Sequence, residues 1–263
     1  MVGKRKNSAI FALINLMLTL NDITIGYRDK TVAQGLTATL HRGCLTCLVG
    51  ANGTGKSTLL RTITAFQRPL AGTVTMQGKD MHGCSRQEQA ALTSVVLTGR
   101  PAVRLLTVRE VVSMGRAPYT GMWGRLTAED ESVVEESIAL VGIEGLAERS
   151  IQTLSDGECQ KVMIAKALAQ QTPLVVLDEP TAFLDYPSKV ETLLLMKRLV
   201  SDGTRAVLLS THDMELALRL ADELWLMTRD GRLLSGTAEE LAEPLANEQL
   251  IIKNEQLIIN NGD

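Results

Sequence analysis

The sequence predicts an α/β protein with a mainly parallel β-sheet, and three features support this fold class. Short apolar runs bounded by turn residues recur along the chain, helical patterns lie between several of them, and one long stretch breaks the alternation. Apolar strands that alternate with helices indicate a parallel sheet covered on both faces. We therefore expect a sheet core with a helical subdomain inserted into it.

The elements follow from these patterns in chain order. The candidate strands of the sheet are the apolar runs 45–49, 95–97, 174–177, 206–209 and 224–227. The helical patterns that alternate with them are 56–65, 157–170 and 188–201. Residues 107–154 break the rhythm, and Thr127 and Gly142 are typical of the start and end of a helix there. We predict that the inserted helical subdomain spans about residues 99–160.

Composition excludes some functions. The 263 residues are 45% hydrophobic and 22% charged, which is ordinary for a soluble globular protein. The formal net charge is −3, so no global basic field points to nucleic acid, and the 3% of aromatic residues argue against a base-stacking surface. We therefore expect no nucleic-acid partner.

Cys44 and Cys47 form a CxxC pattern at the start of an apolar run that indicates a strand. Positions i and i+3 of a strand point to opposite faces and lie roughly 10 Å apart. A disulfide needs Cα atoms within about 7 Å. We interpret the pair as core cysteines, not as a redox or metal site.

The two ends of the chain are expected to lie outside the main domain. Lys4, Arg5 and Lys6 precede an apolar run at 9–20 that resembles the start of a signal peptide, but no small-x-small cleavage site follows. The run is too short to span a bilayer, so we interpret residues 1–17 as an N-terminal extension. Residues 247–253 are repeated as 254–260, and two heptapeptides are too few for a coiled coil. Residues 246–263 are therefore assigned as a tail without a function.

A glycine-rich loop between an apolar strand and a helix supplies the first candidate site. It fits the pattern GxxxxGK[ST], and its residues are Gly50, Ala51, Asn52, Gly53, Thr54, Gly55, Lys56 and Ser57, followed by Thr58. Glycines let backbone N–H groups wrap around phosphate oxygens, and the start of the helix adds a partial positive charge. We expect Lys56 to neutralise the β- and γ-phosphates and Ser57 to ligate Mg²⁺. The loop therefore predicts nucleotide binding.

Another apolar strand ends in two carboxylates, Asp178 and Glu179. Asp178 at the strand end is expected to hold Mg²⁺ through water, and Glu179 beyond it can polarise the attacking water as a general base. The Asn/Thr-Lys-x-Asp motif with which GTPases read the base does not occur in the sequence. The nucleotide is therefore not expected to be GTP.

The segment Leu-Ser-Asp-Gly-Glu at residues 154–158 resembles the signature motif of the ABC (ATP-binding cassette) family. Ser155 and Gly157 open a long helix whose first N–H groups can be donated to an anion. In the family that anion is the γ-phosphate bound by the opposite subunit. The resemblance implies a head-to-tail dimer of two copies with ATP between them, contacted by Ser155, Gly157 and Glu158.

Further motifs match the family in the same order along the chain. Tyr27 corresponds to the aromatic residue that stacks on adenine, Asp185 to the acidic residue of the loop that couples the two sites, and His212 to the histidine that contacts the γ-phosphate. The resemblance covers residues 18–245. It implies an ATPase with a P-loop NTPase (RecA-like) core, an N-terminal antiparallel β region and the inserted helical subdomain. ATP and Mg²⁺ are the implied cofactors, and the implied catalytic residues are Lys56, Glu179 and His212.

One position departs from the family pattern. The lid glutamine that touches Mg²⁺ or its water falls at Thr98 in this sequence. A threonine has a hydroxyl but a shorter reach than glutamine. Thr98 is kept as a candidate ATP-binding residue.

Residues 107–119, with the sequence TVREVVSMGRAPY, are similar to the ABC importers for ferric siderophores, haem and cobalamin. This subgroup implies integral membrane permease subunits as partners, a solute-binding protein as an indirect one, and a peripheral position on the cytoplasmic face of the inner (plasma) membrane. A soluble ABC ATPase of the iron–sulfur assembly type is the alternative, and co-purification with a permease would separate the two. A scaffold without catalysis is disfavoured by Glu179 and His212.

Overall fold

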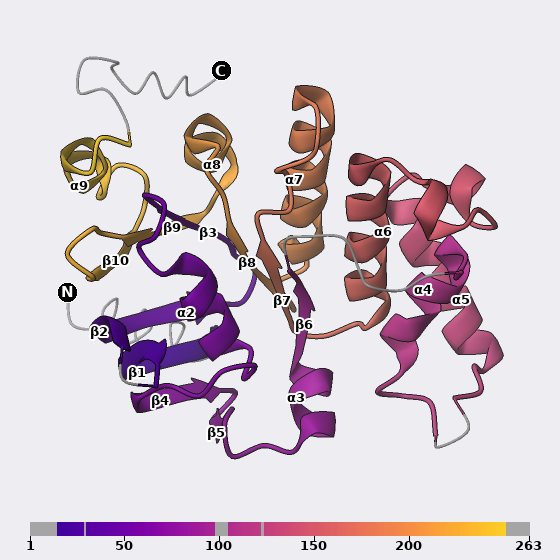
Figure 1. Ribbon diagram of the computed structural model, residues 1–263, viewed down its shortest axis with the longest axis horizontal. Coiled ribbons are helices and arrows are strands. Elements are labelled where there is room, and N and C mark those ends of the chain that lie inside the picture. Colours follow the sequence, from indigo (N-terminus) through magenta and orange to yellow (C-terminus); the bar gives the residue numbers. More distant parts are fainter. Residues whose placement is uncertain (1–14, 29, 98–104, 122–123, 251–263) are drawn as a thin grey trace, which may run out of the picture.

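The computed structural model describes residues 15–28, 30–97, 105–121 and 124–250. Figure 1 shows two sheets side by side and a helical region beyond the far edge of the larger sheet. Thr98, most of the N-terminal extension and the second heptapeptide lie outside the described residues.

The larger sheet has the strand order β10-β9-β3-β8-β7-β6. All pairs from β9 to β6 are parallel, and only β10 runs antiparallel to its neighbour β9. Every residue of β3, β7 and β8 is buried, as expected for parallel strands covered on both faces. The mainly parallel sheet is therefore confirmed. Its strands are β3 (Leu45–Gly50), β6 (Thr93–Val96), β7 (Leu174–Asp178), β8 (Ala206–Ser210), β9 (Glu223–Met227) and β10 (Leu233–Gly236).

The smaller sheet is antiparallel and confirms the β region expected near the N-terminus. Its strand order is β2-β1-β4-β5, with β1 (Leu16–Tyr27), β2 (Lys30–His41), β4 (Ala71–Met76) and β5 (Lys79–Asp80). Strand β1 begins at Leu16, and Met17 is fully buried, so these two residues belong to the strand and not to the extension.

Helices cover both faces of the parallel sheet. On one face, Leu59 and Leu60 of α2 (Lys56–Ile63) pack with Leu48 of β3 and with the antiparallel sheet. On the other face, Cys47 of β3 joins a core that includes residues of α7 (Tyr186–Val200) and α8 (Met214–Leu220). The remaining helices that the structure describes outside the helical region are α3 (Arg86–Leu92) and α9 (Ala242–Asn247).

All four cysteines are free thiols, and Cys47 is completely buried, which confirms its interpretation as a core residue. Burial raises the pKa of the Cys47 thiol to about 12. Cys44 lies just before β3 and is partly buried. No helix in the described part of the chain is long and apolar enough to cross a membrane.

The helical region contains α4 (Val108–Ser113), α5 (Ala128–Leu140) and α6 (Asp156–Ala169), with three single-turn 3₁₀ helices between them. Thr127 caps α5, and Gly142 follows its end in a left-handed conformation, as the sequence predicts. Helix α6 runs beyond residue 160 and contacts β6, so it connects this region to the sheet.

Candidate functional site

The loop between β3 and α2 depends on three glycines in left-handed conformations. Gly50, Gly53 and Gly55 have φ angles of 150°, 80° and 104°. A Cβ at Gly50 would lie 2.4 Å from the carbonyl oxygen of Met227, so a side chain does not fit there. Gly55 precedes the first residue of α2. The glycines therefore allow the loop to turn tightly into the helix start.

The polar side chains of this loop are held by the loop itself. Lys56 is 7% exposed, and its Nζ donates to the carbonyl oxygens of Gly50 (2.8 Å) and Ala51 (3.0 Å). Thr54 Oγ1 also donates to Ala51 O (3.0 Å). Burial lowers the pKa of Lys56, and the negative charges of Glu179 and Asp178 oppose this shift. Asn52 and Ser57 are exposed at the mouth of the loop.

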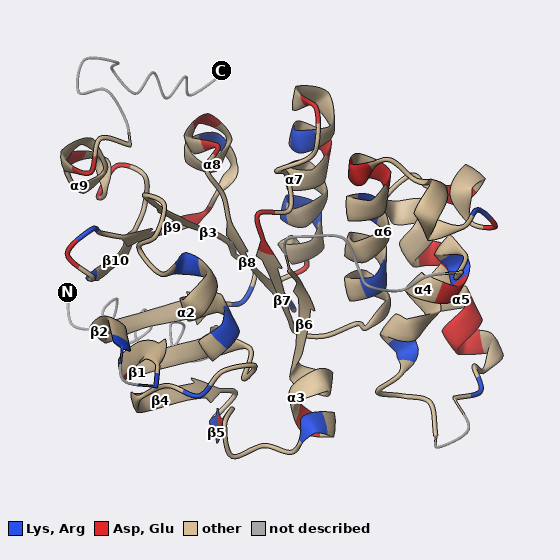
Figure 2. Cartoon of the chain, viewed as in Figure 1, with Lys and Arg blue, Asp and Glu red and all other residues tan. Residues whose placement is uncertain are grey.

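The two carboxylates lie at the same edge of the sheet as this loop, because β3, β8 and β7 are adjacent and parallel. Asp178 ends β7, is 6% exposed and accepts a hydrogen bond from Ser210 Oγ (2.6 Å). Glu179 follows in a left-handed conformation with φ 50°. Figure 2 shows acidic residues where β7 meets α7 and a basic residue at the start of α2.

His212 follows the end of β8 and contacts Glu179. The distance between His212 Nε2 and Glu179 Oε1 is 2.5 Å, and the histidine side chain is 44% exposed. A histidine nitrogen and a carboxylate in hydrogen-bond contact can orient one another and exchange a proton. The structure therefore brings together the two residues that the sequence predicts as base and γ-phosphate contact.

Tyr27 stands beside helix α2 at the end of β1. Its hydroxyl is 3.1 Å from Thr58 Oγ1, and its ring is 49% exposed. A pocket of about 620 Å³ adjoins it, lined in part by Arg28, Phe66 and Leu97. The exposed ring is available for stacking against a planar group.

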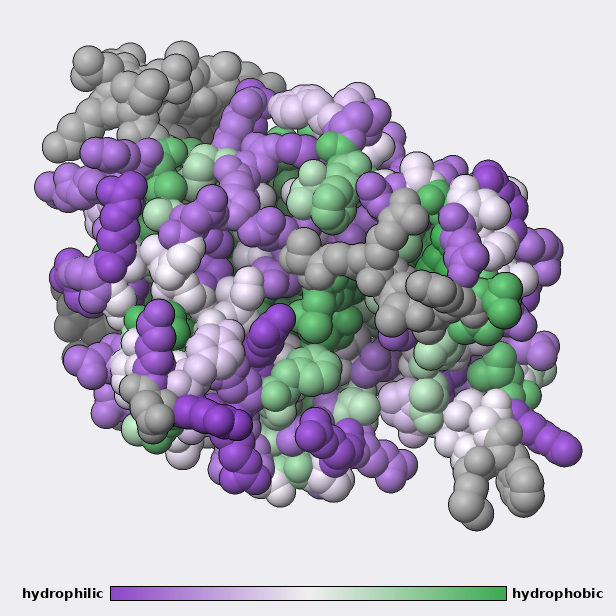
Figure 3. All heavy atoms as spheres, viewed as in Figure 1, coloured by the Kyte–Doolittle hydropathy of each residue, from purple (hydrophilic) through white to green (hydrophobic). Residues whose placement is uncertain are grey.

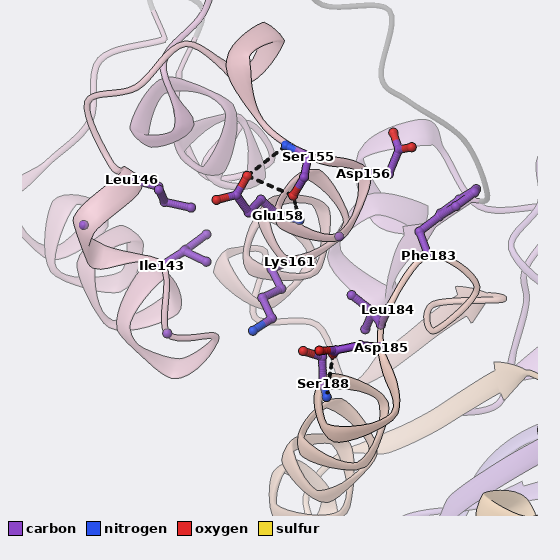
Figure 4. Close-up of a pocket in the computed structure, with 13 residues that line it drawn as sticks. Ile143, Leu146, Ser155, Asp156, Glu158, Lys161, Phe183, Leu184, Asp185 and Ser188 are labelled. Atoms are coloured by element: carbon purple, nitrogen blue, oxygen red, sulfur yellow. Dashed lines mark hydrogen bonds between the residues drawn. The ribbon is translucent and has the colours of Figure 1, made fainter.

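Ser155, Gly157, Glu158 and Asp185 form a second group of predicted residues. They line a pocket of about 670 Å³, with Ser155 and Glu158 on one wall and Asp185 on the facing wall (Figure 4). Asp185 caps helix α7 and accepts from the backbone N–H of Ser188 (3.1 Å). Hydrogen bonds from Ser188 lower the pKa of Asp185.

Ser155 caps helix α6 in a reciprocal arrangement with Glu158. Ser155 Oγ accepts from the Glu158 N–H (3.2 Å), and Glu158 Oε2 accepts from the Ser155 N–H (2.8 Å) and Oγ (2.9 Å). These bonds lower the pKa of Glu158. A Cβ at Gly157 would lie 3.3 Å from Leu184, so glycine lets the helix start approach the loop before α7.

Among the described residues, the pocket lined by Ser155 and Asp185 is separate from the glycine loop. The pocket in Figure 4 is lined by none of the described residues 50–58 and not by His212. In Figure 1, α2 and α6 lie on either side of β7 and α7. In the described part of the chain, the glycine loop at 50–58 and the start of helix α6 at Ser155 therefore lie on two separate surfaces.

Ser210 is the functional candidate that the sequence does not single out. It is fully buried, pairs with Asp178 in the ladder between β7 and β8, and contacts both carboxylate residues. Its only signal in the sequence is a polar residue at the end of an apolar strand. The contact depends on strand register, which a single sequence does not display.

Known proteins resemble this chain over most of its length. The family model described as "ABC transporter" matches residues 33–182. The iron(3+)-hydroxamate import ATP-binding protein FhuC of Bacillus subtilis is 37% identical over 227 residues, which cover 86% of this chain and 84% of that protein. The cobalamin import ATP-binding protein BtuD of Halobacterium salinarum is 37% identical over 218 residues, covering 83% of this chain and 54% of that protein.

Solved structures share the fold. An ATP-binding cassette solved as a dimer in a post-hydrolysis state with ADP and Pi has a TM-score of 0.76 and 24% identity, covering 84% of this chain and 98% of that chain. The family match, the relatives and the glycine loop with its carboxylates converge on one assignment. The chain belongs to the ABC transporter family, in which it is an ATP-binding, ATP-hydrolysing subunit similar to those of iron-chelate and cobalamin importers.

Proposed function

We propose that this subunit couples ATP binding and hydrolysis to the import of an iron chelate of the siderophore type, with haem and cobalamin as the other substrates of the same subgroup. The observation that carries the catalytic part is the contact between Glu179 and His212 beside Asp178 and the glycine loop. The importer part is supported by relatives named for hydroxamate and cobalamin import. The proposed nucleotide-binding domain begins with strand β1 at Leu16 and runs to residue 245, with the helical subdomain at about 99–160.

The described residues fit ATP and Mg²⁺. Gly50, Gly53 and Gly55 leave backbone N–H groups unobstructed by side chains, Lys56 supplies a positive charge, and Tyr27 offers its ring for adenine. No group of three or more His, Cys, Asp and Glu side chains in the described residues could hold a metal ion. A magnesium ion therefore needs phosphate and water ligands besides the proposed ones, Ser57 and Asp178, with Thr98 as a further proposed contact.

ATP with Mg²⁺ supplies the phosphoanhydride bond and the charge neutralisation for the reaction. In our proposal, Glu179 accepts the proton of the attacking water, and His212 orients Glu179 through the 2.5 Å contact. Asp178 accepts a hydrogen bond from Ser210 at the end of β7. It lies at the same edge of the sheet as the glycine loop that carries Lys56. The chain thus contributes a base, its orienting partner and a cation.

The second surface is proposed to bind the nucleotide of another copy. Ser155, Gly157 and Glu158 open a 14-residue helix, and the first N–H groups of a helix attract anions. This helix start and Asp185 share a pocket that excludes the chain's own loop. A head-to-tail dimer would place the loop of one copy against the Ser155 surface of the other. The related cassette solved as a dimer has the same fold.

We propose permease subunits as the membrane partner, a solute-binding protein as an indirect one, and the cytoplasmic face of the inner (plasma) membrane as the location. Apolar side chains are exposed on residues 107–119, the segment that resembles the importers, where Met114 is 44% and Tyr119 is 46% exposed. Leu97 and Leu105, on either side of the segment 98–104, are exposed as well. Figure 3 shows apolar surface near the middle of the face that it presents. Such surface supports docking of a partner.

Glu179→Gln tests the catalytic assignment. Because glutamine keeps the shape but cannot accept the proton, we expect ATP binding to persist while hydrolysis falls by at least about a hundredfold. Glu215→Gln on α8 is the matched control, since this exposed glutamate pairs only with Arg219 among the described contacts. Hydrolysis at the normal rate in Glu179→Gln would refute the general-base role.

Uptake measurements test the substrate. Cells that carry the chain and its permease should take up ⁵⁵Fe-labelled hydroxamate siderophore, and the Glu179→Gln variant should abolish that uptake. Labelled cobalamin and haem are assayed in parallel, and uptake of one of these alone reassigns the substrate within the subgroup. A chain that supports no uptake and does not co-purify with a permease would contradict import.

A further inference from the structure

Ser210 contacts both residues at the end of β7, the carboxylate of Asp178 and the backbone N–H of Glu179. It is the last residue of β8, is fully buried, and pairs with Asp178 in the parallel ladder between β7 and β8. Because both strands end here, the Ser210 side chain lies where the chain leaves β7 for Glu179. The family resemblance assigns no role to it.

The Ser210 hydroxyl acts both as a donor and as an acceptor toward these neighbours. It donates to Asp178 Oδ1 at 2.6 Å and accepts the backbone N–H of Glu179 at 2.9 Å. A serine has one hydroxyl proton, so the bond to the carboxylate fixes the direction in which the oxygen lone pairs face Glu179. Hydrogen bonds to charged groups are shorter and stronger than neutral ones, which agrees with the 2.6 Å distance.

The bond to Glu179 acts at a strained peptide. Glu179 has φ 50°, a conformation that residues with a Cβ avoid unless their surroundings hold them in it. The ladder between β7 and β8 ends at Asp178 and Ser210, and the Glu179 N–H finds its partner in the Ser210 side chain. Holding this peptide aims the Glu179 carboxylate at His212, 2.5 Å away.

We propose that Ser210 is a positioning residue for ATP hydrolysis, which sets the orientation of the Asp178 carboxylate and the backbone of Glu179 with a single hydroxyl. The inference rests on the proposed roles of Asp178 and Glu179. A purely structural role, in which the hydroxyl only satisfies the end of the sheet, is the competing explanation. The two differ in what happens to a folded protein that lacks the hydroxyl.

Ser210→Ala removes one oxygen atom and adds no volume. We expect kcat for ATP hydrolysis to fall about ten- to hundredfold, as is typical when the partner of a metal-ligating carboxylate is lost, while KM for ATP stays within about twofold. Ser94→Ala is the matched control, because Ser94 is also a fully buried strand serine whose hydroxyl is hydrogen-bonded, to Thr172, but it lies on β6. Ser94→Ala should hydrolyse ATP at the normal rate. Ser210→Thr restores a hydroxyl and should recover part of the loss if it folds.

A second readout does not depend on turnover. Binding of Mn²⁺ to the ADP-loaded protein is followed by electron paramagnetic resonance, and Ser210→Ala should weaken it about tenfold while ADP binding in EDTA is unchanged. A Ser210→Ala protein with normal kcat and normal Mn²⁺ affinity overturns the inference, even if its unfolding temperature falls.

Glu179→Gln is assayed in the same experiment to separate the two claims. If Glu179→Gln is inactive and Ser210→Ala is normal, the Ser210 inference alone fails. If Glu179→Gln itself hydrolyses ATP normally, the proposed general base fails first.

Discussion

Burial shifts the pKa values of several side chains in this protein, among them Lys56, Cys44 and Cys47. Lys56 is buried against the carbonyl oxygens of its own loop, and phosphate oxygens would compete for its amine as charged and therefore stronger acceptors. The Cys44 and Cys47 thiols are buried to different degrees, and in both cases burial is the main cause of a raised pKa. Burial thus keeps these two thiols protonated, although β3 leads directly into the loop that carries Lys56.

Thiol reactivity provides a prediction at this scale. The pKa values of Cys44 and Cys47 are raised to about 11 and about 12, so at pH 8 roughly one thiol in a thousand or fewer is a thiolate. Because the thiolate is the nucleophile, we expect iodoacetamide to leave both residues unmodified in the native protein and to modify them once urea unfolds it. Mass spectrometry of the peptides measures this. Rapid native labelling of Cys47 would contradict its place in the core.

Most residues of the candidate site could be predicted from sequence motifs. The remaining contacts depend on how β7 and β8 pair in the sheet. Lys56, Asp178 and His212 follow from local patterns, because each stands at the end of an apolar strand or the start of a helix. The pairing of Ser210 with Asp178 could not be predicted, since it requires knowing that β7 and β8 are neighbours in a given register. The contact between His212 and Glu179 has the same origin.

At the scale of elements, a buried ion pair holds the helical region together. Arg116 Nε lies 2.8 Å from Asp130 Oδ1, and Arg116 Nη1 donates to the carbonyl oxygen of Ala169 at the end of α6. Asp130 also forms the capping box of α5 with Thr127. One carboxylate therefore joins the start of α5 to the chain that precedes it and, through Arg116, to α6.

Unfolding as a function of pH tests this ion pair. Hydrogen bonds from Thr127 and Arg116 lower the pKa of Asp130 to about 2, below its ordinary value of about 4. The stabilisation is therefore complete above about pH 4 and is lost as the pH falls towards 2. We expect Asp130→Asn to lower the unfolding temperature by several degrees at pH 7, with a difference from the unmodified protein that shrinks at pH 2.5.

The matched control for Asp130→Asn is Glu131→Gln, an exposed residue in the first turn of the same helix. It should leave the unfolding temperature within about one degree, as surface substitutions usually do. An Asp130→Asn protein that unfolds like the unmodified protein at pH 7 would show that the ion pair does not stabilise the helical region.

The predictability of the elements follows their hydrophobic pattern. Apolar runs flanked by turns predict the parallel strands from β3 to β9, because strands buried on both faces consist mostly of apolar residues. Strands β1 and β2 were harder to place, since several register shifts interrupt their pairing and disturb the alternation of buried and exposed residues. Their antiparallel arrangement was predicted only from the resemblance to the family.

The described part of the chain presents two half-sites on separate surfaces. The loop 50–58 and the Glu179–His212 pair lie at the carboxyl edge of the sheet, whereas Ser155 and Asp185 line a pocket between α6 and α7. Neither half is complete by itself in our proposal, because ATP at the loop lacks the helix N-terminus that a second copy would add. Assembly and catalysis are therefore coupled through the nucleotide.

The mass of the Glu179→Gln protein in solution, measured by analytical ultracentrifugation with and without Mg-ATP, tests this central claim most directly. Because Glu179→Gln retains ATP, we expect one chain per particle without nucleotide and two chains at saturating Mg-ATP. Adding Ser155→Arg to the same variant should prevent dimer formation without removing ATP binding. The bulky arginine side chain would block the start of helix α6, where the nucleotide of the other copy is proposed to bind. A Glu179→Gln protein that binds Mg-ATP and stays monomeric at saturation would contradict the account.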